Sequence, residues 1–139
     1  MKIFEYNLSE IDTVAQKLLI EAKNHNIIAL TGPLGAGKTT LTAAMLKALG
    51  VQGLVISPTF TYLNQYQAAD GRRIYHFDLY RLQNIAEFAQ LGFFEYLDQQ
   101  NSLVFVEWPE IILPKLQQKV LLLNISSIDD KKRKISYEL

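Results

Sequence analysis

One eight-residue segment has the composition and spacing of a phosphate-binding loop. Residues 32–39 read Gly-Pro-Leu-Gly-Ala-Gly-Lys-Thr and satisfy every fixed position of the pattern G-x-x-x-x-G-K-[ST]. Glycines let the chain turn so that successive backbone N–H groups face one anion, and the following helix adds its positive N-terminal end. In this pattern Lys38 reaches the β- and γ-phosphates, and the Thr39 hydroxyl ligates Mg²⁺. The segment predicts a nucleoside triphosphate site that works with Mg²⁺.

The other contacts to the triphosphate are expected from the backbone of Gly35, Ala36 and Gly37 and from Thr40, which can meet the α-phosphate. Pro33 has no N–H to donate, but it comes early in the loop, so we expect it to stiffen the turn without removing a contact. A glycine-rich turn before an ordinary helix is the competing interpretation. The apolar run before the segment and the helical pattern after it favour nucleotide binding.

Two acids directly follow apolar, strand-like runs. Asp78 follows residues 74–77, and Glu107 follows residues 103–106. Open α/β sheets place their ligand sites at the carboxyl ends of such strands. Nucleotide hydrolysis needs an acid near the metal and a group that positions water. A strand-end carboxylate in water is the alternative, but beside a phosphate loop we expect both acids to be catalytic and metal-binding residues.

A threonine lies between the loop's helix and the next strand. Residues 57–61 read Ser-Pro-Thr-Phe-Thr, and in GTPase-like proteins a threonine in this interval closes onto Mg²⁺ when the γ-phosphate is present. Thr59 is the candidate, with Ser57 as a second choice. Position alone favours an ordinary loop threonine.

These residues need strands and helices that bring them to one edge of a sheet. Ser9 and Asp12 have the spacing of a helix cap with its reciprocal acid, and Gly92 interrupts the last helical pattern. The patterns predict strands at residues 2–7, 26–31, 59–66, 72–77, 102–106, 119–125 and 134–139, and helices at residues 11–22, 40–49 and 84–99. Such alternation predicts one α/β domain over residues 1–139: a three-layer P-loop NTPase domain with a central, mostly parallel sheet and antiparallel edge strands.

Composition excludes several other classes of protein. The chain has 139 residues, with 14 basic and 14 acidic side chains, so no overall field attracts nucleic acid or membrane. It has no cysteine and two histidines, which excludes disulfides, thiolate zinc sites and a histidine-rich metal site. The N-terminus lacks a signal-peptide core, and the apolar runs are too short to span a bilayer. We therefore expect a cytoplasmic protein without membrane contact.

Four segments together resemble the TsaE (YjeE) family, the small bacterial ATPases of tRNA threonylcarbamoyladenosine biosynthesis. They are residues 32–40, 57–61, 76–82 (His-Phe-Asp-Leu-Tyr-Arg-Leu) and 107–110 (Glu-Trp-Pro-Glu), in the family's order and spacing. The resemblance covers most of the chain and implies ATP and Mg²⁺ as ligands. It also implies association with the TsaD–TsaB complex, which transfers a threonylcarbamoyl group to an adenosine beside the anticodon. Contact with tRNA would then be indirect, through that complex.

The resemblance also implies a role for each candidate residue. Lys38 and Thr39 keep their phosphate and Mg²⁺ roles, and Thr59 becomes the switch threonine. Asp78 is the essential acid of the family's H-x-D-x-Y-R segment, and Glu107 is the Walker-B-like acid. ATP rather than GTP rests on the resemblance, because the sequence has no recognisable base-reading motif.

Several residues keep open interpretations. Trp108 could stack on a partner, report nucleotide binding or pack in the core, and Arg81 could pair with a phosphate, a partner carboxylate or a surface acid. The basic run 131–134 could meet tRNA phosphates, although a solvated hairpin turn is favoured. Pro33 replaces an acidic residue of many family members.

Three other functions compete with the ATPase. A regulatory GTPase would carry N-K-x-D and D-x-x-G, and neither occurs. A small-molecule P-loop kinase usually needs a lid with several arginines, whereas only Lys115 and Lys119 lie between Glu107 and the final strands. A module that uses nucleotide only as a structural switch would bind without hydrolysis.

Overall fold

A mixed sheet of seven strands runs through the molecule in the computed structural model, which describes residues 1–139. The strands are β1 (Lys2–Asn7), β2 (Ile27–Thr31), β3 (Leu63–Gln67), β4 (Arg73–Asp78), β5 (Ser102–Glu107), β6 (Val120–Ser127) and β7 (Lys132–Tyr137). The α-helices are α1 (Ile11–Glu21), α2 (Lys38–Ala48) and α3 (Ile85–Gln90), and the 3-10 helices are η1 (Leu8–Glu10), η2 (Phe93–Asp98), η3 (Pro109–Ile111) and η4 (Leu113–Lys115).

The order of the strands is β1-β7-β6-β2-β5-β4-β3. The four central strands, β6, β2, β5 and β4, are parallel. Both edges are antiparallel, with β3 on β4 at one side and β7 and β1 beyond β6 at the other. The register sets Asp78 opposite Glu107 at the carboxyl ends of β4 and β5. The predicted parallel centre with antiparallel edges is confirmed, and the parallel part is limited to these four strands.

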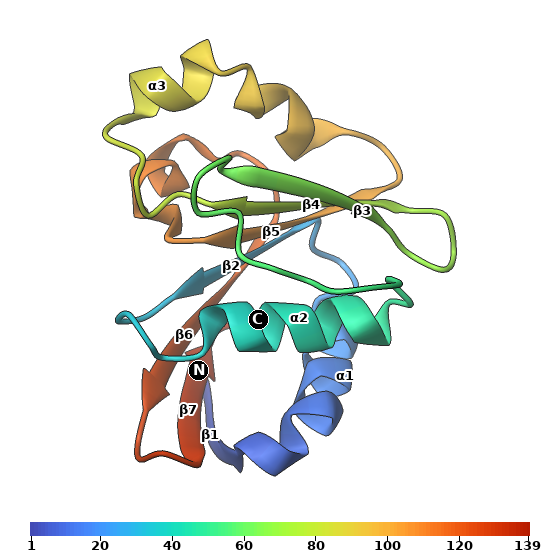
Figure 1. The fold of residues 1–139 in the computed structure, drawn as a ribbon, viewed down its shortest axis with the longest axis vertical. Helices are drawn as coiled ribbons and strands as arrows, with labels where there is room; N and C mark the ends of the chain where they lie inside the picture. The colour runs from blue at the N-terminus through green and yellow to red at the C-terminus, as the bar shows by residue number, and fades with distance from the viewer.

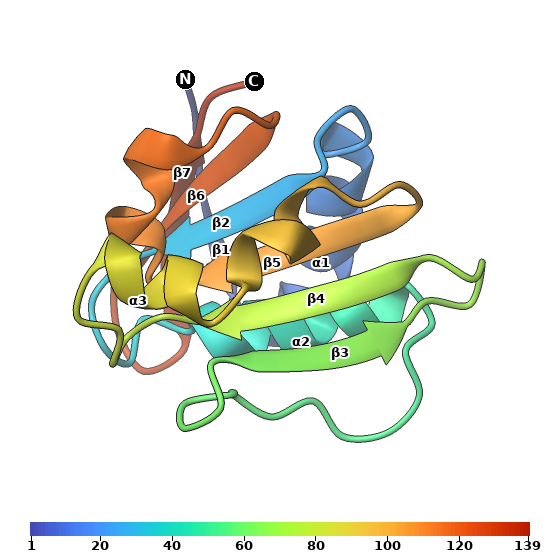
Figure 2. The same cartoon turned by 90° about the horizontal axis from the view of Figure 1, so that it is seen from above.

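Helices cover both faces of the sheet and complete the three layers (Figures 1 and 2). α1 and α2 lie against one face, and α3 and η2 lie against the other, over β4 and β5 (Figure 2). Because the central strands are covered on both sides, they carry continuous apolar runs such as residues 27–30, all fully buried. No helix among them combines the length with the apolar composition of a membrane span.

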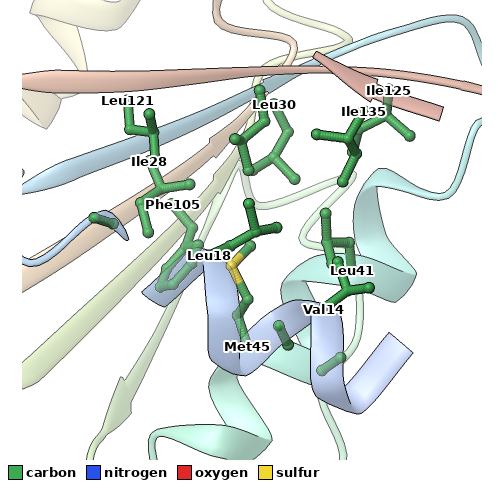
Figure 3. Close-up of a cluster of buried hydrophobic side chains, with 14 of the residues drawn as sticks. Val14, Leu18, Ile28, Leu30, Leu41, Met45, Phe105, Leu121, Ile125 and Ile135 are labelled. Carbon is green, nitrogen blue, oxygen red and sulfur yellow. The ribbon is translucent and has the colours of Figure 1, made fainter. Parts of the chain in front are cut away.

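The larger core lies under α1 and α2 (Figure 3). Val14 and Leu18 of α1, and Leu41 and Met45 of α2, are each four residues apart, so each pair lies on one side of its helix. The sheet side chains that meet them are Ile28, Leu30, Phe105, Leu121, Ile125 and Ile135. This packing fixes α2, and with it the lysine and threonine of the predicted phosphate loop.

Aromatic rings fill the opposite face behind the carboxyl end of β4. The ring of Phe77 lies 5.6 Å from Phe88 of α3 and 5.3 Å from Phe93 of η2, between centroids. Tilted and edge-on contacts at these distances stabilise aromatic pairs beyond their burial. Since Phe77 precedes Asp78, the cluster anchors the strand end that carries this predicted acid.

α1 begins at Ile11 as predicted, but the predicted capping pair is wrong by two residues. Glu10 Oε1 accepts the backbone N–H of Asn7 at 2.8 Å, so the reciprocal cap is the pair Asn7 and Glu10, not Ser9 and Asp12. A 3-10 turn at Leu8–Glu10 precedes the helix and shifts the cap along the chain.

The predicted strand 59–66 is also too long, because β3 begins at Leu63. Tyr62 has φ +67°, in the left-handed region that a strand residue does not adopt. Its N–H donates to the Pro58 carbonyl oxygen at 2.8 Å and closes a turn. Thr59 therefore lies in a loop. Predicted helix 84–99 is split at Gly92 into α3 and η2, where the interruption was expected.

Candidate functional site

The loop between β2 and α2 requires glycine at both of its ends. Gly32 has φ +146°, and a Cβ built there would lie 2.2 Å from the carbonyl oxygen of Ile125 on β6. The backbone of a central strand cannot move aside, so only glycine fits. Gly37 has φ +101° and turns the chain into α2 as its N-cap. The first N–H groups of α2 have no acceptor within the helix, which is the arrangement that the expected anion site requires.

Lys38 is held at the loop by its own backbone. Its ammonium donates to the carbonyl oxygens of Gly32 at 2.6 Å and Pro33 at 2.9 Å. It also lies 4.0 Å from the centre of the Trp108 ring, a cation–π contact. Burial lowers the pKa of Lys38, and the charge of Glu107, the strongest of three acidic neighbours, partly offsets this effect. Pro33, which has no N–H to donate, thus contributes its carbonyl oxygen as an acceptor for Lys38.

Thr39 and Glu107 meet across two elements. The Thr39 hydroxyl, in the first turn of α2, donates to Glu107 Oε1 at 2.7 Å. Glu107 Oε2 lies 2.5 Å from Nε2 of His76 on the neighbouring strand β4. Glu107 is 2% exposed, so this carboxylate is buried and paired at both oxygens. The structure thus brings into contact two of the four residues that sequence analysis expects at Mg²⁺.

Asp78 is held differently, by the segment before β3 and by the turn that follows its own strand. The Ser57 hydroxyl donates to Asp78 Oδ2 at 2.5 Å, and the Tyr80 N–H donates to Oδ1 at 3.0 Å. Thr59 Oγ1 lies 3.2 Å from Ser57 Oγ and makes no hydrogen bond to Asp78. Ser57, the second choice in the sequence, is therefore the residue in contact with the acid, and Thr59 stands one hydrogen bond further away.

These residues line one cavity of about 400 Å³, a size typical of small-ligand sites. Its lining residues are Leu34, Gly35, Gly37, Lys38, Thr39, Thr40, Ser57, Thr59, Asp78, Tyr80, Arg81, Glu107, Trp108 and Arg133. Every predicted site residue is among them except Ala36, whose side chain is buried in the core. A second hollow of about 440 Å³ beside the β6–β7 turn contains none of the predicted site residues.

Arg133 is a site residue that sequence analysis missed. It belongs to β7, and its Nε donates to the Ala36 carbonyl oxygen in the loop at 3.0 Å. Its Nη1 donates to the carbonyl oxygen of Asp129 at 2.7 Å. The basic run 131–134 was expected to be a solvated turn, and for Arg133 this interpretation is wrong. The guanidinium connects the hairpin to the loop and faces the cavity.

Trp108 and Arg81 acquire definite contacts. Trp108 has φ +57°, a left-handed backbone at the end of β5, and its ring lies 4.9 Å from that of Tyr80. A non-glycine residue in this conformation is strained, and such strain is concentrated at functional sites. The Arg81 guanidinium lies 4.7 Å from the centre of the Phe60 ring and forms no ion pair with an acid.

The donor set fits a magnesium ion that arrives with its nucleotide. No group of three or more histidine, aspartate or glutamate side chains gathers into a metal cage. Mg²⁺ typically binds one or two carboxylates together with substrate phosphates and water. Thr39 and Glu107 supply a hydroxyl and a carboxylate, and Asp78 supplies a second carboxylate in the same cavity.

A family model and several similar proteins all point to the same family. The model of the family described as threonylcarbamoyl adenosine biosynthesis protein TsaE matches residues 6–135. Three similar proteins are named tRNA threonylcarbamoyladenosine biosynthesis protein TsaE. The one from Haemophilus influenzae is 44% identical over 104 residues, 75% of this chain and 65% of its own length. The Rickettsia conorii protein is 38% identical over 125 residues (89% and 70%), and the Bacillus subtilis protein is 36% identical over 132 residues (94% and 80%).

A solved structure extends the similarity to the fold. The crystal structure of Bacillus subtilis YdiB matches with a TM-score of 0.73 at 31% identity, covering 98% of this chain and 84% of that chain. The chain spans only 65% of the length of the Haemophilus influenzae relative. The match to the family model includes the phosphate loop, both acids and Arg133. The chain therefore belongs to the TsaE family.

Proposed function

We propose that this protein is a Mg²⁺-dependent ATPase that acts in tRNA threonylcarbamoyladenosine biosynthesis. The observation that carries the proposal is the 2.7 Å contact between Thr39 and Glu107 in a cavity that Lys38 also lines. A hydroxyl from the phosphate-loop helix and an acid from a strand end hold Mg²⁺ in P-loop nucleotidases. The pathway is inferred from the family, because the relatives carry it in their names.

The buried part of the cavity would bind the triphosphate. Lys38 already lies at the loop, and phosphate oxygens would replace the carbonyl oxygens that it now contacts. The backbone of Gly35, Ala36 and Gly37 and the side chain of Thr40 would hold the remaining oxygens. Bound Mg²⁺ would neutralise charge on the β- and γ-phosphates.

The loop side of the cavity would carry out hydrolysis. We assign the orientation of the attacking water to Asp78, because Glu107 contacts the proposed Mg²⁺ ligand Thr39, whereas Asp78 contacts the loop that carries Thr59. Thr59 lies in the same wall and is proposed to close onto Mg²⁺ when the γ-phosphate is present.

We further propose that the protein acts with the TsaD–TsaB complex in the cytoplasm, and meets tRNA only through that complex. Leu34, which lines the cavity, is 75% exposed, and Phe60, whose ring contacts the cavity residue Arg81, is 81% exposed. Such exposed side chains beside a nucleotide site suit burial by a protein partner. A partner that covers the mouth of the cavity would also shield the cavity from bulk solvent.

The decisive experiment is ATP turnover with Mg²⁺, measured alone and with the TsaD–TsaB complex. We expect weak activity alone, a rise with the partners, and near-complete loss in Lys38→Ala, Asp78→Ala and Glu107→Ala. Asp70→Ala removes an exposed acid in the β3–β4 turn and is the control that should behave as wild type.

Two results would contradict the proposal. Full turnover in the Asp78 and Glu107 variants would remove the catalytic assignment. Phosphoryl transfer to an added nucleoside or sugar, faster than hydrolysis, would show a kinase instead.

A further inference from the structure

A buried histidine lies behind the proposed metal site. His76 of β4 is fully buried, and its Nε2 lies 2.5 Å from Glu107 Oε2 on the adjacent strand β5. Side chains alternate along a strand, so His76 and Asp78 share one face of the sheet. It is the face that α2 covers, since Ile74, two residues earlier, packs in the same core as α2. His76 thus stands one step deeper than the two acids, and it does not line the cavity.

The surroundings of the imidazole indicate which nitrogen carries the proton. His76 Nδ1 is buried and has no hydrogen-bond partner. A buried N–H without an acceptor is rarer in proteins than an acceptor without a donor. The proton is therefore on Nε2, which donates to Glu107 Oε2. The other oxygen, Oε1, accepts from Thr39, so each oxygen of the carboxylate has one donor.

A glutamate at this position needs such a restraint. P-loop nucleotidases commonly use an aspartate here, and glutamate has one more methylene group and one more freely rotating bond. Without a second donor the glutamate carboxylate could rotate away from Thr39. Holding the side chain in one rotamer costs conformational entropy, which a second hydrogen bond can offset. His76, on the neighbouring strand β4, restrains Oε2, while Thr39, on α2, contacts Oε1.

We propose that His76 is a positioning residue that holds Glu107 in the orientation required for Mg²⁺, an inference that rests on the proposed function. A residue needed only to fill the core would not introduce a buried nitrogen without a partner. The contact to Glu107 explains why a polar ring stands among apolar neighbours. Hydrogen-bond partners of metal-binding carboxylates typically influence metal affinity or activity by about 10- to 100-fold.

Three substitutions separate the hydrogen bond from the packing. The amide nitrogen of glutamine is three bonds from Cβ, as is Nε2 of histidine, so His76→Gln can keep the donor. The amide nitrogen of asparagine is only two bonds from Cβ, so His76→Asn is polar but too short. His76→Phe keeps the ring and removes the donor.

The first measurement is the Mg²⁺ concentration that half-saturates ATP binding. We expect His76→Gln to stay near wild type, and His76→Asn and His76→Phe to need about 10- to 100-fold more Mg²⁺. Nucleotide binding without Mg²⁺ should remain unchanged in all three and checks that they fold. Unchanged Mg²⁺ dependence in His76→Phe, or equal losses in the glutamine and asparagine variants, would overturn the proposal. If His76→Phe does not fold, the glutamine–asparagine pair still decides.

The second measurement needs no nucleotide. Long-range ¹H–¹⁵N spectra of the free protein should show His76 protonated at Nε2, with a shift of this signal in Glu107→Gln. The chain has only two histidines, so His25→Asn completes the assignment. A proton on Nδ1 would contradict the contact. A wild-type protein that binds no Mg²⁺–ATP but shows the Nε2 proton would instead refute the proposed function alone.

Discussion

The two acids of the cavity are held by very different parts of the molecule. Glu107 contacts Thr39 of α2 and His76 of β4, both in regular elements that pack in the core. Asp78 depends on Ser57, in the irregular segment between α2 and β3. The first group, Lys38, Thr39, His76 and Glu107, is called here the buried half of the site. The second, Ser57, Thr59 and Asp78, is called the loop half.

The difference indicates which half can move. The segment that carries the loop half exposes Leu54 at 84% and Phe60 at 81%, so little apolar burial stabilises it. Segments with few buried contacts open locally at low free-energy cost. The buried half is therefore preorganised for binding, and Ser57 and Thr59 of the loop half can respond to the γ-phosphate or to a partner, while Asp78 stays fixed at the end of β4. Binding and hydrolysis should accordingly be separable by substitution.

The largest effect is expected where the buried half is built, at Gly32. Gly32→Ala would place a Cβ 2.2 Å from the Ile125 carbonyl oxygen, which should destabilise the protein by about 3 kcal/mol or more and abolish nucleotide binding. Gly35→Ala is the matched control. No atom lies within 4 Å of its added Cβ, so only backbone strain of about 1–2 kcal/mol remains. Urea unfolding and ATP titration measure both, and equal losses would show that the close approach to β6 is unimportant.

A smaller, selective effect is expected in the loop half. Ser57→Ala removes the hydroxyl that donates to Asp78, so ATP turnover should fall by about 10- to 100-fold while ATP affinity stays near wild type. Hydrogen exchange in residues 57–62 should become faster. Thr61→Ala, an exposed neighbour in the same segment, is the control for both measurements. A loss of affinity as large as the loss of turnover would mean that the two halves do not act separately.

A smaller effect, on stability, is expected when the contact between Trp108 and Lys38 in the buried half is removed. Trp108→Leu removes the cation–π contact and the packing on Tyr80, and should lower the free energy of unfolding by about 1–2 kcal/mol. Trp108→Phe keeps a ring and should recover most of that loss. Thermal unfolding compares them. Trp108 is the only tryptophan, so its fluorescence should also change when phosphates draw Lys38 away. Identical stability of both variants would show that the ring contact is unimportant.

Sequence reasoning succeeded where a local rule was enough. The rule that parallel strands end at one edge of a sheet predicts that Asp78 and Glu107 lie together, and their register bears this placement out. Thr59 was located in the correct wall but assigned to a strand, because nothing in the sequence signals the left-handed Tyr62. Similarly, no local pattern predicts a left-handed Trp108.

Arg133 shows what a more complete reading could have found. Its contact with Ala36 joins residues 97 positions apart, and only the place of the β6–β7 hairpin beside β2 creates it. A signal was nevertheless present. Arg133, Ile135 and Tyr137 alternate along β7, and the last two are buried. Extending the predicted strand back from residue 134 to residue 132 would have put Arg133 on the inner face of the hairpin.

The smallest expected effect concerns pH. Burial lowers the pKa of Lys38 in the free protein, and bound phosphates would raise it again, so ATP binding should take up a proton as pH increases. ATP affinity should thus be constant at low pH and fall as pH rises through the lowered pKa, before an ordinary lysine would titrate. The decline can reach about tenfold per pH unit. Lys38→Arg stays charged, so its weaker binding should not show this decline. Isothermal titration calorimetry in buffers of different ionisation enthalpy measures the proton uptake directly. Equal pH dependence in the wild type and in Lys38→Arg would mean that the pKa of Lys38 does not control ATP affinity.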